Sequence, residues 1–437
     1  MRRSCRIFIF AVFASHLALL LFLFSRAGSP SAATFPEQHL LSNSFSHLTS
    51  HLELELQQQK RILDMLRPIT NRTSKPRQKF PRADAGVAIL VVACDRPSIS
   101  RCLDSLLHSR QELVARGRDS ESRILSRFPI FVSLGCNNRP TAQMIIRYKD
   151  KVTLLQAPEE VTQFEPKLPP TQKKLTGYYR IATHYKWALQ QIFNVMEYEA
   201  AVVVEDDLEV SPDFLEYFLA TLPLLSTDSS LLCASAWSDN GRPELVEVSR
   251  PDLLHRTDFF PGLGWLLRQE LWQELEPVWP KAFWDDWLRE PAQRKGRQCL
   301  RPEVPRSETF GRSGVSQGQF FDRHLRYVRR WRGYVSFSTL ALDYLEPKRY
   351  AQEMEQRLMA AKEVSSLSEL ETVAQQDGNE ELVLRLSGQN NLAGAVRALG
   401  IMGDLKANIA RNSYRGLIPL MYRGRRLYLI YQKPSDS

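Results

Sequence analysis

The sequence has few cysteines, no internal repeat and a single long hydrophobic run. Six cysteines stand among 437 residues and none forms a CxxC pair, so a zinc site is not expected. No Ser-His-Asp pattern indicates a nucleophilic triad. The net charge of +9 arises from 58 basic and 49 acidic residues without a long arginine-rich tract, which argues against nucleic acid as a partner. A hydrophobic content of 43% is enough for a large core.

The hydrophobic run covers residues 7–24 and is about the shortest that crosses a bilayer as a helix. Three arginines precede it and only Arg26 follows closely, which predicts a cytosolic tail of residues 1–6 and a lumenal remainder. Small residues at 31–33 also allow a cleaved signal peptide. Because the run is longer than the usual apolar core of about 7–15 residues, an uncleaved transmembrane signal anchor is favoured. Polar residues 25–85 are interpreted as a stem, with a glycosylation sequon at Asn71.

Apart from Cys5 in the tail, five widely spaced cysteines remain. They are Cys94, Cys102, Cys136, Cys233 and Cys299. Two disulfides with one thiol left over fit a secretory compartment, whereas five reduced thiols fit the cytosol. The N-terminal anchor favours the secretory compartment.

From Gly86 onward, short apolar strands alternate with helical patterns. Val87–Ala93 is continuously apolar, which is typical of a strand buried on both faces of a sheet. Further strands are expected at 130–133, 152–155, 201–204 and 231–236, and helices at 177–193 and 214–222. The alternation predicts a three-layer α/β domain with a mostly parallel central sheet over 86–335. A smaller α+β region, with strands near 381–386 and 426–431 and a helix near 392–399, is expected over 336–437.

The strongest sign of a functional site is the segment at 200–214, AAVVVEDDLEVSPDF. Its valines predict a core strand, and Glu205, Asp206 and Asp207 follow where that strand ends. Ser211 and Pro212 then resemble a helix start, and Pro223 is expected to stop that helix. Ligands of open α/β sheets bind outside the carboxyl ends of strands. A divalent metal that holds a nucleotide diphosphate and an acidic surface turn explain this cluster about equally well.

A second unusual segment, 259–289, is crowded with tryptophan and phenylalanine. Core packing explains most of these rings, although aromatic faces beside carboxylates also hold sugars. Asp285 and Asp286 stand between two tryptophans and are not expected to be both buried and unpaired. Ser307–Phe321 contains several glycines and small polar residues, which predicts a mobile loop that closes over a ligand.

Six motifs in one order resemble the N-acetylglucosaminyltransferase I family. They are VVACDR at 91–96, GYYRIATHYKWAL at 177–189, VVVEDDLEVSPDF at 202–214, DFFPGLGWLL at 258–267, WPKAFWDDWLR at 279–289 and TFGRSGVSQGQFF at 309–321. The resemblance implies a GT-A fold, UDP-GlcNAc as donor and Mn²⁺ as cofactor. It also implies inverting transfer of GlcNAc to the 2-hydroxyl of the α-1,3-arm mannose of a high-mannose N-glycan on glycoproteins. Together with the anchor, it implies a single-pass type II Golgi membrane protein with a lumenal catalytic domain.

The resemblance also implies roles for individual residues. Asp207 matches the only side chain on the metal, and Glu205 and Asp206 match contacts to the donor's sugar and ribose. Asp285 matches the base that takes the proton of the mannose 2-hydroxyl. Asp286 is the rival for that role, and only the family match selects Asp285.

Three further residues match donor contacts of the family. Arg96 and His184 match nucleotide contacts, and Ser316 matches a contact in the closing loop. Without the match, Arg96 would be interpreted as a surface turn residue and His184 as a hydrogen-bonded helix histidine. The family's disulfides correspond to Cys94–Cys136 and Cys233–Cys299, which leaves Cys102 as a free, buried thiol.

One pair of residues departs from the family. Leu134 and Gly135 stand where the family has Gln-Asp, whose Asp bonds to uracil, and the lost bond is worth ~1–3 kcal/mol. Weaker donor binding with intact chemistry is therefore expected. Two other functions stay open. A related transferase for O-linked mannose is disfavoured because its extra N-terminal carbohydrate-binding domain is missing, and a non-catalytic Golgi lectin is disfavoured because Asp207 and Asp285 are retained.

Overall fold

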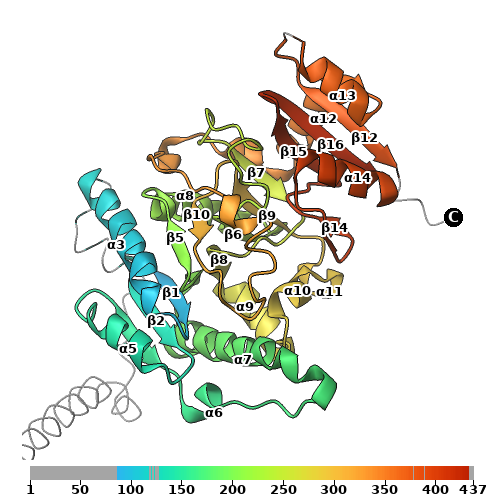
Figure 1. Ribbon diagram of the computed structural model, residues 1–437. Coiled ribbons are helices and arrows are strands. Elements are labelled where there is room, and N and C mark those ends of the chain that lie inside the picture. The colour runs from blue at the N-terminus through green and yellow to red at the C-terminus, as the bar shows by residue number, and fades with distance from the viewer. Residues whose placement is uncertain are drawn as a thin grey trace, which may run out of the picture. The chain divides into compact units, whose positions relative to one another are not determined.

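The computed structural model describes residues 86–117, 120, 123, 127–376, 378–387 and 389–432 (Figure 1). The predicted anchor at 7–24 and the predicted stem at 25–85, with Asn71, lie outside this part of the chain. Among the described residues, no helix combines the length and apolar character needed to cross a membrane.

The centre of the fold is an eight-stranded sheet with the strand order β3-β2-β1-β4-β8-β6-β9-β7. Its strands are β1 (Val87–Ala93), β2 (Ile130–Leu134), β3 (Thr153–Gln156), β4 (Ala200–Glu205), β6 (Leu231–Ser235), β7 (Leu254–Thr257), β8 (Trp265–Arg268) and β9 (Gln298–Pro302). All of them except β7 and β8 run in the same direction. The predicted α/β fold with a mostly parallel sheet is therefore confirmed.

Helices cover both faces of this sheet. They are α3 (Ser100–Ala115), α5 (Arg139–Ile146), α6 (Glu159–Thr162), α7 (Thr176–Gln190), α8 (Phe214–Thr227), α9 (Gln269–Leu275), α10 (Trp284–Arg289) and α11 (Pro291–Arg294). In β1, Ile89 belongs to a core cluster shared with α3 and α8, whereas Leu90 belongs to a second cluster shared with α7 and α9. Alternate side chains of one strand thus enter two cores, which explains its continuously apolar sequence.

The segment after β4 differs from the prediction in two ways. The helix begins at Phe214, but its N-cap is Asp213 rather than Ser211, and Pro212 precedes the cap. The Asp213 carboxylate does not cap the helix because it pairs with the buried guanidinium of Arg306 at 3.1 Å. The helix also continues past Pro223 to Thr227. Pro223 lies on its exposed face, so the helix tolerates the lost hydrogen bond while the following turn packs on the core.

Two short strands near the acidic residues were not predicted. β5 (Leu208–Val210) follows the acids directly and pairs antiparallel with β10 (Ser307–Thr309). The predicted loop Ser307–Phe321 therefore begins as a strand. This pairing fixes the start of the loop beside the end of β4.

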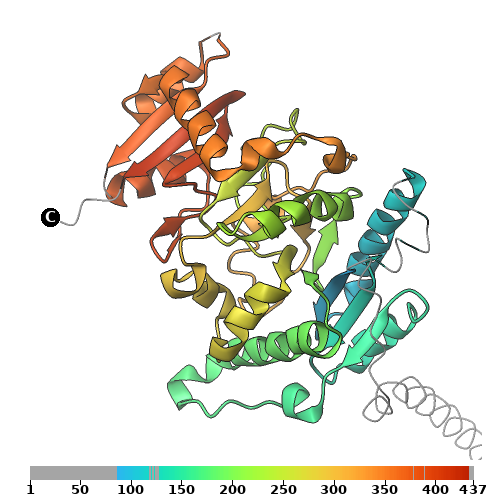
Figure 2. The same ribbon diagram turned by 180° about the vertical axis from the view of Figure 1, so that it is seen from behind.

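The C-terminal region forms a second sheet with the strand order β11-β12-β16-β15, seen from behind in Figure 2. Its elements are β11 (Lys362–Val364), β12 (Leu382–Ser387), β15 (Leu417–Tyr422), β16 (Arg425–Gln432), α12 (Pro347–Ala360), α13 (Leu367–Ala374) and α14 (Gln389–Leu399). Only the pairing of β15 with β16 is antiparallel. The two predicted strands and the predicted helix are present, together with a small hairpin of β13 (Leu405–Lys406) and β14 (Ile409–Ala410).

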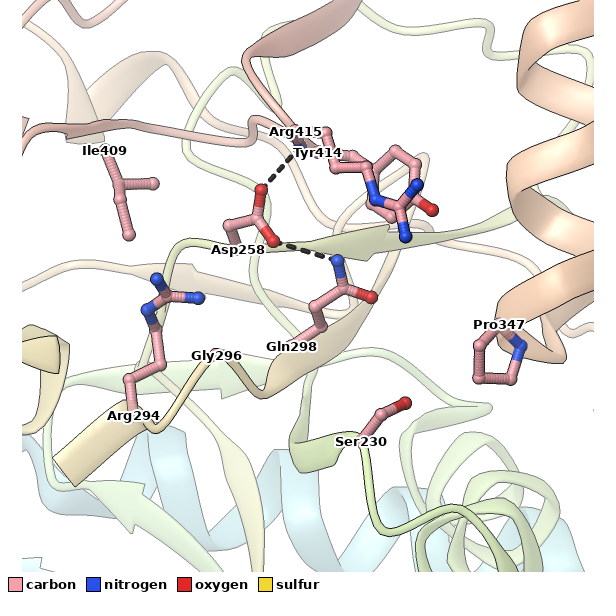
Figure 3. A pocket seen from close by; sticks show the side chains of 9 residues that line it. All are labelled: Ser230, Asp258, Arg294, Gly296, Gln298, Pro347, Ile409, Tyr414 and Arg415. Carbon is pink, nitrogen blue, oxygen red and sulfur yellow. Dashed lines mark hydrogen bonds between the residues drawn. The ribbon is translucent and has the colours of Figure 1, made fainter. Parts of the chain in front are cut away.

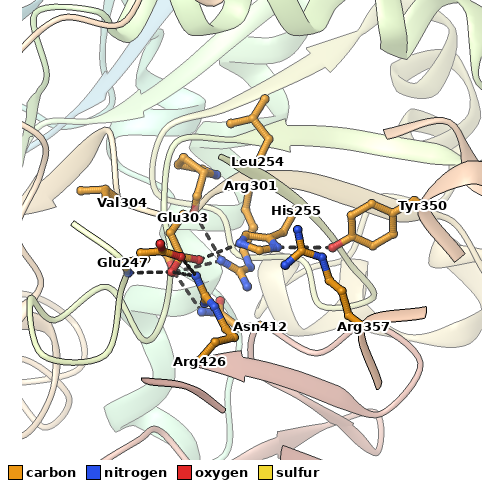
Figure 4. Close-up of polar contacts among 12 residues, drawn as sticks. Glu247, Leu254, His255, Arg301, Glu303, Val304, Tyr350, Arg357, Asn412 and Arg426 are labelled. Atoms are coloured by element: carbon orange, nitrogen blue, oxygen red, sulfur yellow. Dashed lines mark hydrogen bonds and ion pairs between the residues drawn. The ribbon is translucent and has the colours of Figure 1, made fainter. Parts of the chain in front are cut away.

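A buried ion network connects this second sheet to the main one (Figure 4). Glu303, next to β9, lies 2.9 Å from Arg426 of β16 and 2.6 Å from His255 Nε2 of β7. Burial lowers the pKa of His255 to about 4, so its imidazole is neutral at neutral pH. With its proton on Nε2, the ring donates to Glu303 and accepts from the Tyr350 hydroxyl at 3.3 Å. The carboxylate of Glu303 therefore compensates a buried arginine from the other sheet.

Candidate active site

The predicted acids lie at the carboxyl end of β4, beside the end of the parallel strand β1. The register pairs Val92 with Glu205, so Arg96 in the loop after β1 reaches the acids. Its Nε donates to Asp206 Oδ1 at 2.7 Å, and its Nη2 lies 3.5 Å from Asp207 Oδ2. The sheet therefore brings one cation next to the predicted carboxylates.

Asp206 is the best compensated of the three acids. Besides Arg96, the backbone N–H of Cys94 donates to its Oδ2 at 3.0 Å. Cys94 is bonded to Cys136, which confirms this predicted disulfide and joins the loops after β1 and β2. The predicted Cys233–Cys299 bond, which joins β6 to β9, and the free, buried Cys102 are confirmed as well.

Glu205 is half-buried, and its carboxylate accepts a hydrogen bond from the Tyr185 hydroxyl of α7 at 2.9 Å. Burial raises its pKa to about 8, and the charge of Asp207 adds to this shift. The charge of Asp285 raises the pKa of Glu205 further, so that residue acts on the same cluster. The structure thus links the two acidic segments that the sequence analysis singled out.

Asp207 is left partly uncompensated. Its Oδ1 is buried, and no described residue donates a hydrogen bond to it. Burial and the neighbouring charge of Asp206 raise its pKa to about 6, although Arg96 offsets part of this shift. A buried carboxylate oxygen without a donor fits a hard divalent cation, which prefers oxygen ligands. Within the described residues, no three His, Cys, Asp or Glu side chains are grouped to hold a metal by themselves.

The predicted loop lies over these acids. Gly311 packs so closely on Asp207 that a Cβ at this position would overlap the carboxylate Oδ2. Arg96 Nη2 donates to the carbonyl of Ser313 at 2.9 Å. Further along, Val315 contacts Gly177 at the start of α7, where a Cβ would lie only 2.9 Å from its methyl groups. Ser316 follows as an exposed residue, and its predicted donor contact stays a prediction.

His184 is buried in α7, and its Nε2 lies 2.7 Å from the Ser133 hydroxyl of β2. Burial lowers its pKa to about 4, so the ring is neutral. Gly135 packs against this ring, because a Cβ there would overlap His184 Nδ1. The imidazole thus accounts for glycine at this position. The geometry is that of a hydrogen-bonded core histidine, and the predicted nucleotide contact stays a prediction.

Asp285 and Asp286 lie in the first turn of α10, which packs against α7. Trp284 stacks on Tyr185 with ring centroids 4.5 Å apart. Both acids pair with Arg289, at 2.9 Å for Asp285 and 2.7 Å for Asp286. The expectation that they are not both buried and unpaired is confirmed, since the Asp285 side chain is 45% exposed.

A cavity of about 370 Å³ lies at a different place (Figure 3). It is lined by Ser230 and Gln298 at the amino ends of β6 and β9, the edge opposite to the acids. Asp258 in its wall accepts hydrogen bonds from Gln298 Nε2 at 2.8 Å and from the backbone of Arg415. The predicted site residues do not line this cavity.

Sequence reasoning missed four residues that shape the site. Tyr185 and Arg289 belong to quoted motifs, but only packing shows that they contact the acids. Gly311 belongs to the loop that was predicted from its glycines, but the loop composition did not reveal the contact with Asp207. Lys406 bonds to Asp286 from β13 and had no signal, because the two residues are far apart in the sequence.

The fold and these contacts define an α/β protein with a ligand site, suited to a cation, at the carboxyl edge of its sheet. Residues 31–436 match the model of the GNT-I family, and the chain belongs to this family. An Arabidopsis thaliana relative, alpha-1,3-mannosyl-glycoprotein 2-beta-N-acetylglucosaminyltransferase, is 34% identical over 345 residues, which cover 78% of this chain and 73% of the relative.

Two solved structures show weak similarity. S. aureus TarS 1-349 in complex with UDP-GlcNAc is 16% identical, with a TM-score of 0.32 over 63% of this chain and 65% of that chain. The mannosyltransferase PcManGT from Pyrobaculum calidifontis, in complex with GDP-Man and Mn²⁺, is 15% identical, with a TM-score of 0.33 over 77% of this chain and 88% of that chain. At these scores the two structures support no argument about this chain.

Proposed function

We propose that this protein is an inverting glycosyltransferase with a GT-A-type nucleotide-sugar-binding domain. It transfers GlcNAc from UDP-GlcNAc to the 2-hydroxyl of the α-1,3-arm mannose of high-mannose N-glycans. This transfer starts the synthesis of complex and hybrid N-glycans. Family membership and the name of the Arabidopsis relative support this donor and acceptor. The observation that carries the proposal is the buried carboxylate oxygen of Asp207, to which no described residue donates, at the end of β4, next to an α10 whose Trp284 stacks on α7 and whose Asp285 is half-exposed.

On the donor side, Asp207 would hold Mn²⁺ through its carboxylate, whose buried Oδ1 accepts no hydrogen bond from the described residues, and oxygens of the donor would complete the coordination. When bound, the ion supplies positive charge next to the pyrophosphate. Glu205 and Asp206 would contact the sugar and the ribose, and Arg96 the nucleotide. The loop that contains Gly311 and Ser316 partly covers the acids in its observed position, because Gly311 packs directly on Asp207.

On the acceptor side, Asp285 acts as the base. It takes the proton of the mannose 2-hydroxyl while that oxygen forms a bond to the anomeric carbon of GlcNAc. The bond from this carbon to UDP breaks at the same time, and the bonding electrons leave with UDP. One carboxylate is enough, because the attack comes from the face opposite to the leaving group and inverts the anomeric centre.

We also propose that the protein is a single-pass type II membrane protein of the Golgi apparatus with its catalytic domain in the lumen. The apolar run at 7–24 and the arginines before it support this orientation. The two disulfides fit an oxidising compartment.

An incubation of the lumenal part with UDP-GlcNAc, Mn²⁺ and a five-mannose N-glycan tests the function. We expect a product that carries one additional N-acetylhexosamine in β-1,2 linkage on the α-1,3-arm mannose, as read by mass and linkage analysis. A parallel incubation with an O-mannosylated peptide tests the related transferase. Absence of product with both acceptors contradicts enzymatic transfer and favours the non-catalytic lectin.

A further inference from the structure

The two neighbouring carboxylates of α10 are not distinguished by the helix that carries them. A single guanidinium nitrogen, Arg289 Nη1, donates to Asp285 Oδ2 and to Asp286 Oδ1. Arg289 is itself buried and lies over the ring of Phe259 at 4.8 Å. If this were the only partner, either carboxylate would be equally free to meet a substrate hydroxyl.

Lys406 breaks this symmetry. Its ammonium lies 2.8 Å from Asp286 Oδ2, so both oxygens of Asp286 are engaged by cations. For Asp285 Oδ1, no partner is found among the described residues. Burial raises the pKa of Asp286, but the hydrogen bond from Lys406 and the charge of Arg289 outweigh it, and the pKa lies below its usual value. Asp286 is therefore held as an anion, whereas Asp285 keeps one free oxygen.

The hairpin that carries Lys406 is firmly placed. Its two-residue turn has Ala407 and Asn408 at positive φ, which is the geometry of a type I′ turn. Behind the turn, Arg411 pairs with Asp404 at 2.7 Å and with Asp239 of the main domain at 2.6 Å.

Arg411, directly after the hairpin, also shares a packing partner with Arg289 of α10. The Arg411 guanidinium lies over the Phe259 ring at 4.9 Å, and this ring also contacts Arg289. These contacts hold the backbone of Lys406 in place, so its ammonium group stays close to α10. A fixed cation can select between two acids that one helix turn presents together.

We propose that Lys406 is a positioning residue that holds Asp286 away from the reaction and leaves Asp285 to meet the acceptor hydroxyl. The inference rests on the proposed function and deepens it. It gives the C-terminal region a direct part in the acceptor side of the site, although this region contributes none of the residues implied by the family match.

A double-mutant cycle tests this role, with transfer to the five-mannose glycan as the assay. We expect Lys406→Met to lower kcat with the acceptor about fivefold to tenfold, because Asp286 is then no longer held by a second cation and competes with Asp285 for the acceptor hydroxyl. The KM for UDP-GlcNAc should stay unchanged. In an Asp286→Asn background, Lys406→Met should cause no further loss, because the competing charge is gone. Lys406→Arg should restore most of the activity, and Lys348→Met on exposed α12 is the matched control.

Several outcomes would overturn the inference. If Lys406→Met lowers kcat equally in the otherwise unmodified protein and in the Asp286→Asn variant, the lysine acts independently of Asp286. Abolition of transfer by Asp286→Asn alone would make Asp286 the base. If the unmodified protein transfers no sugar to either acceptor, the proposed function itself fails, and this inference fails with it.

Discussion

Asp207→Asn tests whether the acid cluster carries an electrostatic cost that a cation relieves. Burial and the charge of Asp206 raise the pKa of Asp207 from 3.8 to about 6. Because the folded-state pKa is raised, the associated stability is present below about pH 4 and is lost as the pH rises through 6. At pH 7.5 the cost is on the order of 3 kcal/mol. The variant also loses the ion pair between Arg96 and the Asp207 carboxylate, because an asparagine amide carries no charge. This loss reduces the expected net gain in stability to about 1–2 kcal/mol.

The assay is thermal unfolding between pH 4.5 and 7.5, with and without Mn²⁺. Without the ion at pH 7.5, we expect the variant to unfold about 2 °C higher than the unmodified protein, and this advantage should shrink as the pH falls. Mn²⁺ should raise the melting temperature of the unmodified protein more at pH 7.5 than at pH 4.5, because binding displaces protons. The variant should lose most of this response.

The matched control is Asp150→Asn, which changes an exposed carboxylate in a turn outside the site. It should leave both the pH dependence and the Mn²⁺ response unchanged. If Asp207→Asn matches the unmodified protein at every pH and gains equally from Mn²⁺, the reasoning about the cluster is refuted.

Three further predictions concern the base, the loop and the ion network. Asp285→Asn should lower kcat by about 10²–10⁴ without changing the KM for UDP-GlcNAc, and steady-state kinetics with near-normal kcat would contradict its role as base. Gly311→Ala should raise the KM for UDP-GlcNAc, because the new Cβ overlaps Asp207. Gly314→Ala is the control, because a Cβ at this position meets open space. Equal effects of the two substitutions on this KM would argue against the contact. Glu303→Gln should reduce the free energy of unfolding by about 1–3 kcal/mol in denaturant titrations, because it removes one of the two carboxylates that pair with the buried Arg426 and leaves Glu247 as the other; no measurable change would contradict this.

Local sequence patterns were enough to predict the frame of the site. The apolar run of β1 and the valines before Glu205 predict buried parallel strands, and parallel strands end at a common edge. This is why the acids lie at the carboxyl edge of the sheet as expected, whereas the contact of Arg96 with Asp206 was not predicted. The disulfide pairs came from the family resemblance rather than from spacing, and both are present.

Contacts between distant segments could not be predicted in this way. Pro223 is a strong local stop signal, but the packing of Leu225 on the core after it keeps the helix intact. The contact of Gly311 with Asp207 depends on the pairing of β5 with β10, two strands too short to give a periodic signal. Lys406 approaches Asp286 only because the C-terminal hairpin docks on the main domain. Such contacts depend on tertiary packing, which a single sequence does not encode in any local pattern.

The central claim is that Asp207 holds a cation for the donor while Asp285 faces the reacting carbon. A crystal structure with UDP-GlcNAc and Mn²⁺, with the anomalous signal of manganese recorded, tests it most directly. We predict an anomalous peak at the Asp207 carboxylate and the anomeric carbon of GlcNAc on the side of Asp285. A nucleotide bound without an ion, or a donor whose anomeric carbon faces away from Asp285, would contradict the account.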